Sequence, residues 1–555
     1  RCFTVFDGQA CPRPGYVPII ARWHPDGLAR AAYKNMATVS IPTPYSDPAA
    51  DTGFFGHPRG LLVCFTTELW ERFSFYGMKY LLLLYLTKYH LFTDSNGLEV
   101  LGSYAALVYA MPVIGGLLAD RYLGMRKAVV FGGILLVLGH LGMAVEGEQA
   151  RSEGGMILRD EGALQVFYLS LAMIVVGVGF LKPNISTIVG RLYSRDDPRR
   201  DAGFTIFYMG INLGAFTATL LCGYLGETFG WGYGFGVAGI GMSIGLVSFL
   251  VGQRHLHGQA EPHDPALLRQ KSPLGINKER TIYLCALLAV GVAWQMLQFH
   301  GAVGNLLHVM SIVVLLALGW FVTVKCDAVE RSRMIVLVIL TMSTVVFWAL
   351  FEQSAASMTL FADRVMDRTL LGFELTASQF GAMNSFFIFL FAPFFAWLWT
   401  VLGRRGIEPS TPLKFALGIA QAGLGFGALV YGAASPNEAG LVAAYWMVLA
   451  YLLHTCGELC LSPVGLSAVT KLAVPSVVGV MMGAWFLATA YSEFVAVQLA
   501  KLAAIETLEG SVVDINSALA GYTGLFTDLL YVGLGCAGVL LLATPVLKKM
   551  MHGIH

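Results

Sequence analysis

Glu68-Leu69-Trp70-Glu71-Arg72-Phe73-Ser74-Phe75-Tyr76-Gly77-Met78-Lys79 places four charges inside an otherwise apolar stretch, residues 61–86, which reads LLVCFTTELWERFSFYGMKYLLLLYL. As a helix rising about 1.5 Å per residue, this stretch can cross a hydrocarbon core of roughly 30 Å. Glu68, Glu71 and Arg72 share one helical face because they stand at i, i+3 and i+4, and Lys79 lies two turns further along. A charge at the bilayer centre costs about 3 kcal/mol or more. We therefore expect this face to line a wet, protein-walled cavity, rather than to belong to an interfacial helix or a soluble core with solvated charges.

The composition is that of a polytopic membrane protein. Of 555 residues, 56% are hydrophobic and only 13% are charged. The 36 Lys and Arg nearly balance the 35 Asp and Glu, so no basic tract favours nucleic acid. Among the nine cysteines, Cys456 and Cys460 form a CxxxC with no second pair to complete a metal site, and we interpret them as packing residues. No nucleophile–base set or phosphate-cradling loop indicates an enzyme, so no catalytic residue and no metal ligand are assigned.

Apolar segments recur along the whole chain after a polar start. Residues 1–59 are rich in Pro, Gly and Arg and are expected to be mostly disordered. About fourteen spans follow, at residues 61–86, 98–120, 126–146, 164–190, 203–225, 232–252, 281–299, 304–324, 334–361, 376–402, 412–432, 440–468, 476–503 and 522–546.

Basic residues in the connections set the predicted orientation. Lys and Arg gather in alternate loops, at residues 121–127, 191–200, 254–280, 325–333, 404–414 and 548–549. The positive-inside rule places these loops in the cytoplasm, which favours an even number of spans and two cytoplasmic termini.

The segment Gly116-Leu117-Leu118-Ala119-Asp120-Arg121-Tyr122-Leu123-Gly124-Met125-Arg126-Lys127 resembles the loop signature of the major facilitator superfamily. The resemblance implies an all-α fold of two six-helix bundles related by pseudo-symmetry, with substrate bound between them at the midplane. The expected domains are a bundle at residues 60–252, a linker with two extra transmembrane helices at 253–333, a second bundle at 334–547 and a cytoplasmic tail at 548–555.

Three further charges lie deep in apolar segments: Lys182, Glu352 and Glu458. If the first helices of the two halves correspond, Lys79 and Glu352 stand at the same depth, toward the outer end. If the fourth helices of the two halves correspond, Lys182 and Glu458 also stand at the same depth in the membrane, toward the inner end. We therefore predict two opposite-charge pairs, which could serve as outer and inner gates because protonating a carboxylate weakens its bridge. The alternative is that both pairs are static connections between the halves.

Four motifs resemble those of the proton-dependent oligopeptide transporters, over about residues 53–547: Glu68-x-x-Glu71-Arg72-Phe73-x-x-Tyr76-Gly77, Gly179-Phe180-Leu181-Lys182-Pro183-Asn184, Phe207-Tyr208-Met209-Gly210-Ile211-Asn212-Leu213-Gly214-Ala215-Phe216 and Phe351-Glu352-Gln353. The short connection near residues 433–440 is similar to that of bacterial members. The resemblance implies import of di- and tripeptides across the cell's inner membrane, driven by protons, with no other cofactor.

The resemblance also implies roles for individual residues. Arg72, Lys79 and Lys182 would attract the peptide carboxylate, and Glu458, Asn212 and Asn384 would receive its amino end and backbone. Glu68, Glu71 and Glu352, with Arg72, would form the proton-coupling set. Tyr76, Tyr109 and Trp485 are candidates for side-chain pockets, although an aromatic residue in a membrane helix is as often a packing residue.

Two departures from the family pattern affect the presumed pocket. Phe75 stands where the family often has Tyr, which removes a hydroxyl, and Lys79 stands where it often has Arg, which removes the bidentate fork. A relative that carries another solute, such as nitrate, an amino-acid conjugate or a peptide-like drug, is the alternative function.

Other polar residues have weaker interpretations. His454 could tune the protonation of Glu458, but a bond to a backbone carbonyl is the favoured reading. Glu493 has no evident role and is expected near the solvated outer rim. His140, His300 and His308 have no visible partner in the sequence.

Overall fold

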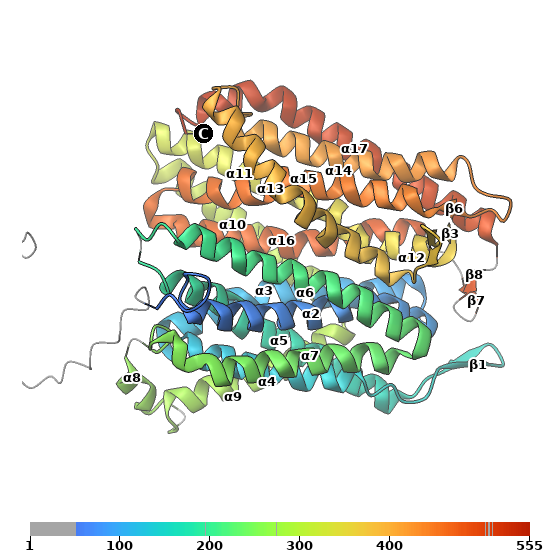
Figure 1. Cartoon of the computed structure of the whole chain (residues 1–555), viewed down its shortest axis with the longest axis horizontal. Coiled ribbons are helices and arrows are strands. Elements are labelled where there is room, and N and C mark those ends of the chain that lie inside the picture. Colours follow the sequence, from blue (N-terminus) through green and yellow to red (C-terminus); the bar gives the residue numbers. More distant parts are fainter. Residues whose placement is uncertain are drawn as a thin grey trace, which may run out of the picture. The chain divides into compact units, whose positions relative to one another are not determined.

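Fourteen long helices dominate the computed structural model, which describes residues 51–554 apart from 195, 263, 274, 505, 506, 509, 510 and 513 (Figure 1). The helices are α2 (Arg59–Lys88), α3 (Asp94–Leu118), α4 (Met125–Met143), α5 (Glu161–Arg191), α6 (Arg200–Phe229), α7 (Trp231–Gly252), α9 (Lys278–Gln298), α10 (His300–Val324), α11 (Ala328–Phe351), α13 (Ala382–Arg404), α14 (Thr411–Ala433), α15 (Ala444–Leu472), α16 (Val478–Ala500) and α17 (Ile515–Met550). Two short helices, α8 (Pro265–Arg269) and α12 (Ser357–Arg364), complete the set.

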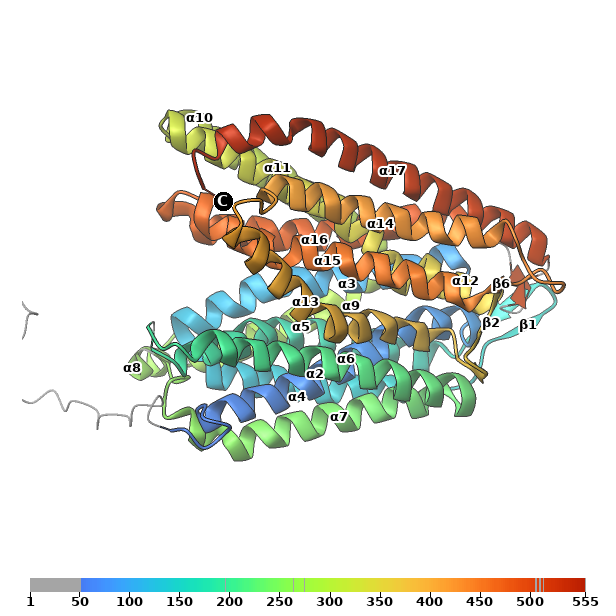
Figure 2. The same ribbon diagram turned by 45° about the horizontal axis from the view of Figure 1, so that its top comes forward.

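The long helices form two groups that repeat one arrangement. Helices α2–α7 make the first half, and α11–α17 make the second, which lies beside it (Figures 1 and 2). Each half gives its second and fifth helices to the interface, because α3 packs on α16 and α6 packs on α13. The extra helices α9 and α10 pack on the outside, α9 against α5 and α10 against α3, α16 and α11. This arrangement matches the predicted pair of six-helix bundles with two added helices.

Side chains at the helix starts satisfy free backbone donors. Asp160 accepts from the Ala163 amide at 3.0 Å at the start of α5, and Asp327 and Glu330 form a capping box at the start of α11. The capping box explains why α11 begins at Ala328, six residues before the predicted span at residue 334, because Asp327 lies in the polar sequence that precedes the apolar run.

Glycine pairs bring equivalent helices of the two halves into close contact. A Cβ on Gly132 of α4 would lie 2.6 Å from the carbonyl oxygen of Gly177 on α5, and a Cβ on Gly418 of α14 would lie 2.8 Å from that of Gly457 on α15. Only glycine allows these backbones to approach so closely, as in other membrane helix pairs. The same contact therefore fixes the third helix against the fourth in each half.

The predicted span at residues 334–361 lies within one candidate membrane span, Ala328–Arg364, but the helix inside it is interrupted. Helix α11 ends at Phe351, a single 3₁₀ turn covers Glu352–Ala355, and α12 begins at Ser357 after Ala356, whose φ and ψ are −115° and −104°. The Gln353 amide donates to the Ala496 carbonyl oxygen of α16 at 2.8 Å. Backbone and side-chain groups at the break are thus satisfied inside the protein, which is the condition for irregular backbone at membrane depth.

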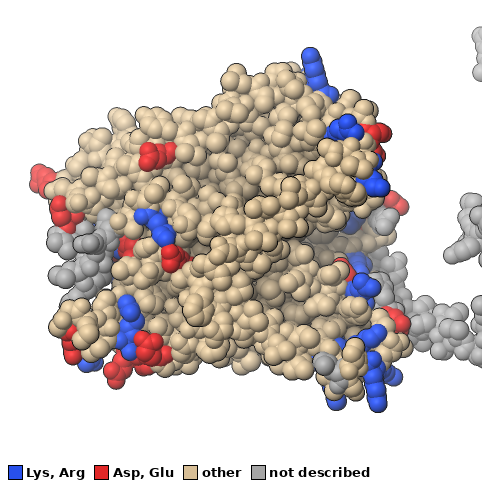
Figure 3. All heavy atoms as spheres, turned by 180° about the vertical axis from the view of Figure 1, so that it is seen from behind, with Lys and Arg blue, Asp and Glu red and all other residues tan. Residues whose placement is uncertain are grey.

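By length and composition, thirteen of the described helices could cross a membrane, and α2 is not among them. Helix α2 misses this test because of its internal charges, yet most of its residues are buried inside the protein. In the space-filling view, charges concentrate toward the two ends and the middle of the face is largely uncharged (Figure 3).

The connections contain short strands and turns. The strands form four two-stranded sheets: β1 (Arg151–Glu153) with β2 (Met156–Leu158), β3 (Met366–Asp367) with β6 (Val442–Ala443), β4 (Thr369–Leu370) with β5 (Phe373–Glu374) and β7 (Thr507–Leu508) with β8 (Ser511–Val512). The predicted loop at residues 116–127 is partly helical, because a π-helix at Ala119–Leu123 continues α3 up to Gly124. The predicted disordered segment is too long at its end, since Arg59 already belongs to α2; its residues 1–50 lie outside the described part.

Candidate functional site

The acidic and basic residues of α2 form a compact buried cluster. The Arg72 guanidinium donates to both carboxylate oxygens of Glu71, with an Nη2–Oε1 distance of 2.6 Å, and its Nε lies 3.2 Å from Glu68 Oε1. Glu68 Oε2 is buried and has no hydrogen-bond partner among the described residues. A desolvated carboxylate oxygen of this kind favours the neutral acid over the charged form. The cluster therefore has one cation for two carboxylates and can accept a proton.

Lys79 lies at the centre of a second cluster, which connects the halves. Its Nζ is 2.7 Å from Glu352 Oε2, at the break after α11, and 3.1 Å from Glu493 Oε1 on α16. The prediction for Glu493 is wrong: the residue is buried at the interface and is not at a solvated rim, because α16 turns this face toward α3 and α2. Phe75 separates the two clusters, with its ring centroid 5.1 Å from Arg72 Cζ and 5.9 Å from Lys79 Nζ.

The predicted inner pair is not formed. No carboxylate of the described residues lies within 4.0 Å of Lys182, whose Nζ instead sits 4.6 Å from the centroid of the Tyr109 ring. Glu458 accepts a hydrogen bond from Asn384 Nδ2 at 3.0 Å, and the same amide donates to Thr455 Oγ1 at 3.1 Å. Lys182 and Glu458 are both half-buried. Among the described residues, neither side chain thus forms a salt bridge, while Lys79 and Glu352 are paired.

The remaining candidates Asn212, Tyr76 and Trp485 differ in whether their side chains are available to a substrate. Asn212 donates to the Tyr208 carbonyl oxygen of its own helix at 3.0 Å, and its side-chain amide also has a second N–H and an acceptor oxygen. Tyr76 is half-buried and stacks on Tyr80, with 6.4 Å between ring centroids. Trp485 is only 5% exposed and covers Gly465 on α15, as a packing residue does.

Three further observations concern Phe75, His454, and His300 with His308. Phe75, the position at which the resembling family often has tyrosine, is 1% exposed. Its ring stacks on that of Tyr104 with 6.5 Å between the ring centroids, so it is part of the core. The favoured reading of His454 is confirmed, because its Nε2 lies 2.9 Å from the Ala422 carbonyl oxygen. His300 and His308, which have no visible partner in the sequence, lie 3.4 Å from Ser103 Oγ and 3.0 Å from the Tyr491 hydroxyl. Both partners come from helices distant in sequence.

Ionic contacts join the halves at the end opposite the basic loops. Arg364 on α12 donates to both carboxylate oxygens of Asp94 on α3 at 2.6 Å, and Lys88 Nζ lies 2.5 Å from Asp363 Oδ1. Glu99 and Lys501 form a third ion pair at 2.5 Å. In addition, Glu227 of α6 accepts hydrogen bonds from the backbone amide and the hydroxyl of Ser378, at 2.9 and 2.6 Å. None of these contacts was predicted, because the residues lie near span ends, where a charge is unremarkable in sequence. Together with the Lys79 cluster, these contacts connect the two halves on this side of the molecule.

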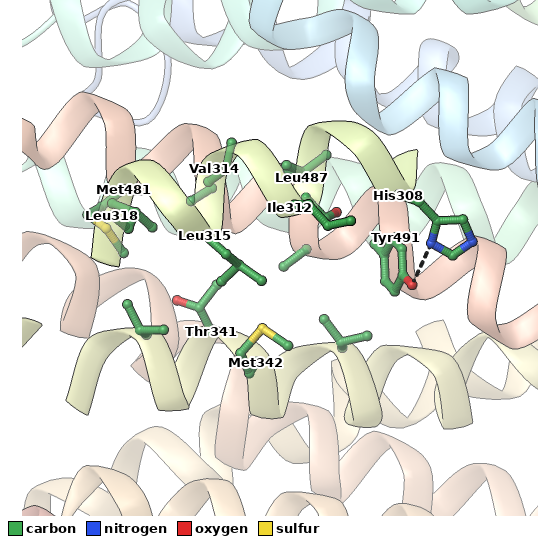
Figure 4. Close-up of a pocket in the computed structure, with 15 residues that line it drawn as sticks. His308, Ile312, Val314, Leu315, Leu318, Thr341, Met342, Met481, Leu487 and Tyr491 are labelled. Atoms are coloured by element: carbon green, nitrogen blue, oxygen red, sulfur yellow. Dashed lines mark hydrogen bonds between the residues drawn. The ribbon is translucent and has the colours of Figure 1, made fainter. Parts of the chain in front are cut away.

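A separate cavity lies between α10, α11 and α16, away from the charged clusters (Figure 4). It measures about 290 Å³ and is lined mainly by aliphatic side chains such as Leu315, Leu318 and Met342. Its polar lining residues are His308, Tyr491, Ser311 and Thr341, and His308 Nδ1 lies 3.0 Å from the Tyr491 hydroxyl oxygen. Without charged groups it cannot recognise a zwitterion, so the candidate site is the charged region between the halves.

Comparison with known proteins identifies relatives along nearly the whole chain. The profile of the POT family matches residues 126–514. The uncharacterized transporter YclF of Bacillus subtilis is 39% identical over 514 residues, which cover 90% of this chain and 96% of that protein. The peptide transporter YePEPT of Yersinia enterocolitica is 38% identical over 471 residues, which cover 80% and 87%.

A solved structure extends the similarity to three dimensions. The crystal structure of a mutant POT peptide transporter in complex with alafosfalin has a TM-score of 0.75 and 36% identity, and the match covers 90% of this chain and 97% of that one. This match confirms the predicted fold.

Proposed function

The chain belongs to the POT family of transporters, and from that premise we propose that it is a proton-coupled symporter that imports di- and tripeptides. The basic loops would face the cytoplasm, with both termini on that side, in the cell membrane. A zwitterion with variable side chains is best recognised at its two constant charges, and the residues between the halves include both cations and acids.

The observation that carries this proposal is the contrast between the two predicted gate pairs. Lys79 and Glu352 are in contact at 2.7 Å, while Lys182 and Glu458 have no opposite charge within 4.0 Å among the described residues. In an alternating-access cycle the outer gate closes while the inner gate is open. Static connections between the halves, the alternative, would be expected to leave both pairs formed.

Lys182 is the cation best placed for the peptide carboxylate. Arg72 is held by Glu71 and Glu68, and Lys79 is held by Glu352 and Glu493. Lys182 lies against the face of Tyr109 and forms no salt bridge within 4.0 Å among the described residues. An ammonium without an anionic partner in a partly buried site gains most from binding one. The half-buried Glu458, oriented by Asn384, is the matching acceptor for the amino end.

Proton coupling would act through the carboxylates that hold the cations. A proton on Glu352 removes its charge and weakens its contact with Lys79, which couples proton binding to opening of the outer gate. On the α2 cluster, a proton on Glu68 or Glu71 would loosen Arg72 in the same way.

Uptake into proteoliposomes tests this function. Labelled dialanine is expected to accumulate when the outside is acidic and to stop accumulating when a protonophore removes the gradient. If uptake ignores the gradient, the proton-coupled assignment is wrong. If nitrate or an amino-acid conjugate competes with the label and unlabelled tripeptides do not, the alternative substrate class is correct.

A further inference from the structure

Lys79 is shared by two carboxylates, and the second one extends the proposed proton site. Its Nζ lies 2.7 Å from Glu352 Oε2 and 3.1 Å from Glu493 Oε1, and the three side chains are 4%, 11% and 5% exposed. A lysine ammonium has three donors on a compact centre, so it can bind two separate carboxylates at once. Lys79 therefore holds Glu352 at the helix break and Glu493 on α16 at the same time.

The charges of this cluster do not balance when both carboxylates are ionised. One ammonium and two carboxylates leave a net charge of −1 in a buried site, which is unfavourable. Among the described residues, the groups that face Glu493 are Lys79 of α2, Glu352 at the helix break, and Tyr104 and Tyr109 of α3. Glu352 is also faced by Tyr76 and Tyr80 of α2 and by Tyr451 and Glu458 of α15, and none of these groups supplies a second cation. On the other side of α16, His308 of α10 contacts Tyr491 and Phe494. One proton on the two carboxylates would make the cluster neutral.

We propose that Glu352 and Glu493 share one proton, so that Glu493 is a second proton-binding site at the outer gate. This proposal rests on the proposed function for its role in transport, although the shared proton itself does not. The proton comes from water and forms one O–H bond on either carboxylate, and Lys79 keeps its own three protons. With one carboxylate neutral, the other still holds Lys79. The gate therefore releases Lys79 only when a second proton has neutralised both acids.

Sharing has a spectroscopic signature that does not depend on transport. With only one carboxylate left beside Lys79, the remaining acid pairs with the ammonium one to one and is expected to be ionised. Infrared difference spectra of the reconstituted protein at neutral pH should therefore lose one protonated-carboxyl C=O band in Glu493→Gln and also in Glu352→Gln. Glu227→Gln is the matched control, because Glu227 also contacts the opposite half but accepts from Ser378 rather than from a cation, and it should leave the band unchanged.

The outcomes separate the proposal from its alternatives. A band that survives in Glu493→Gln would show that Glu493 is simply an ionised partner of Lys79, and a band lost in Glu493→Gln but kept in Glu352→Gln would show an independent acid; either result overturns sharing. Glu493→Asp, which keeps the carboxylate, should retain the band, and a thermal melt confirms that each variant is folded. In uptake assays, Glu493→Gln should respond to pH less steeply than the wild type. If wild-type uptake is independent of the proton gradient, the proposed function fails while the infrared result stands on its own.

Discussion

The buried ion pair between Asp94 and Arg364 allows a quantitative test of how the halves are held together. The guanidinium donates to both carboxylate oxygens at 2.6 Å, and the Arg364 and Asp94 side chains are 3% and 1% exposed. Removing one partner of such a pair costs about 3–5 kcal/mol, because the other charge is left uncompensated. Because Asp94 and Arg364 belong to different halves, removing one of them destabilises the conformation in which the halves are in contact at this end.

Asp94→Asn is therefore expected to shift the equilibrium toward the conformation that is open at this end. With each 1.4 kcal/mol equal to about a tenfold change, the cost of about 3–5 kcal/mol corresponds to a shift of roughly 150- to 4,000-fold. Spin labels at Tyr233 on α7 and Tyr431 on α14, which are 66% and 68% exposed, report the separation of the halves in a cysteine-free background. A longer-distance population should appear in pulsed dipolar spectra of the variant.

Glu99→Gln is the matched control for this experiment. The Glu99–Lys501 pair also joins the halves, at 2.5 Å, but its side chains are 30% and 25% exposed. Exposed pairs contribute about 0–1 kcal/mol, so the shift should be less than about fivefold. The double variant Asp94→Asn with Arg364→Leu should recover much of the closed population, since no unpaired charge remains. Equal distance distributions for Asp94→Asn and the wild type, or equal effects of Asp94→Asn and Glu99→Gln, would refute the reasoning.

Three other variants test separate parts of the account. Lys182→Met is expected to weaken dipeptide binding by about 1.5–3 kcal/mol, or roughly 10- to 150-fold, because it removes the free cation; calorimetric binding constants that match the wild type would exclude a carboxylate site there. Glu352→Gln should abolish proton-driven uptake and leave peptide counterflow measurable, whereas equal loss of both would indicate damage to binding or folding. Trp485→Ala should lower the free energy of unfolding by about 3–5 kcal/mol as a packing residue, and a large loss of peptide affinity without a loss of stability would instead assign it to the pocket.

The sequence predicted the charged helix and the outer pair because those features follow from local rules. Four charges on one face of α2 had to turn inward whatever the rest of the fold, and equal depth in corresponding helices was sufficient to bring Lys79 opposite Glu352. The break after Glu352 was not predictable in this way. The residues around it include no proline or glycine, and the interruption depends on tertiary contacts such as that of Gln353 with α16.

Glu493 was misplaced although a signal was available. A single acid in an apolar span is as unfavourable in lipid as Lys182 is, so it should have been assigned to the same buried region. Sequence alone could not identify its partner, because the rotation of α16 depends on packing against α3. The Lys182–Glu458 pair illustrates a different limit: matched depth identifies residues that can meet, whereas the contact made depends on the conformation.

The central claim is that buried acids and bases between the halves couple proton movement to peptide movement. The most direct test is to trap a pH-sensitive dye inside proteoliposomes and add dialanine outside, with no imposed pH gradient and the membrane potential clamped at zero. The account predicts that the lumen acidifies as peptide enters, and that the acidification is lost in Glu352→Gln. Peptide entry at a normal rate with no change in luminal pH would contradict it.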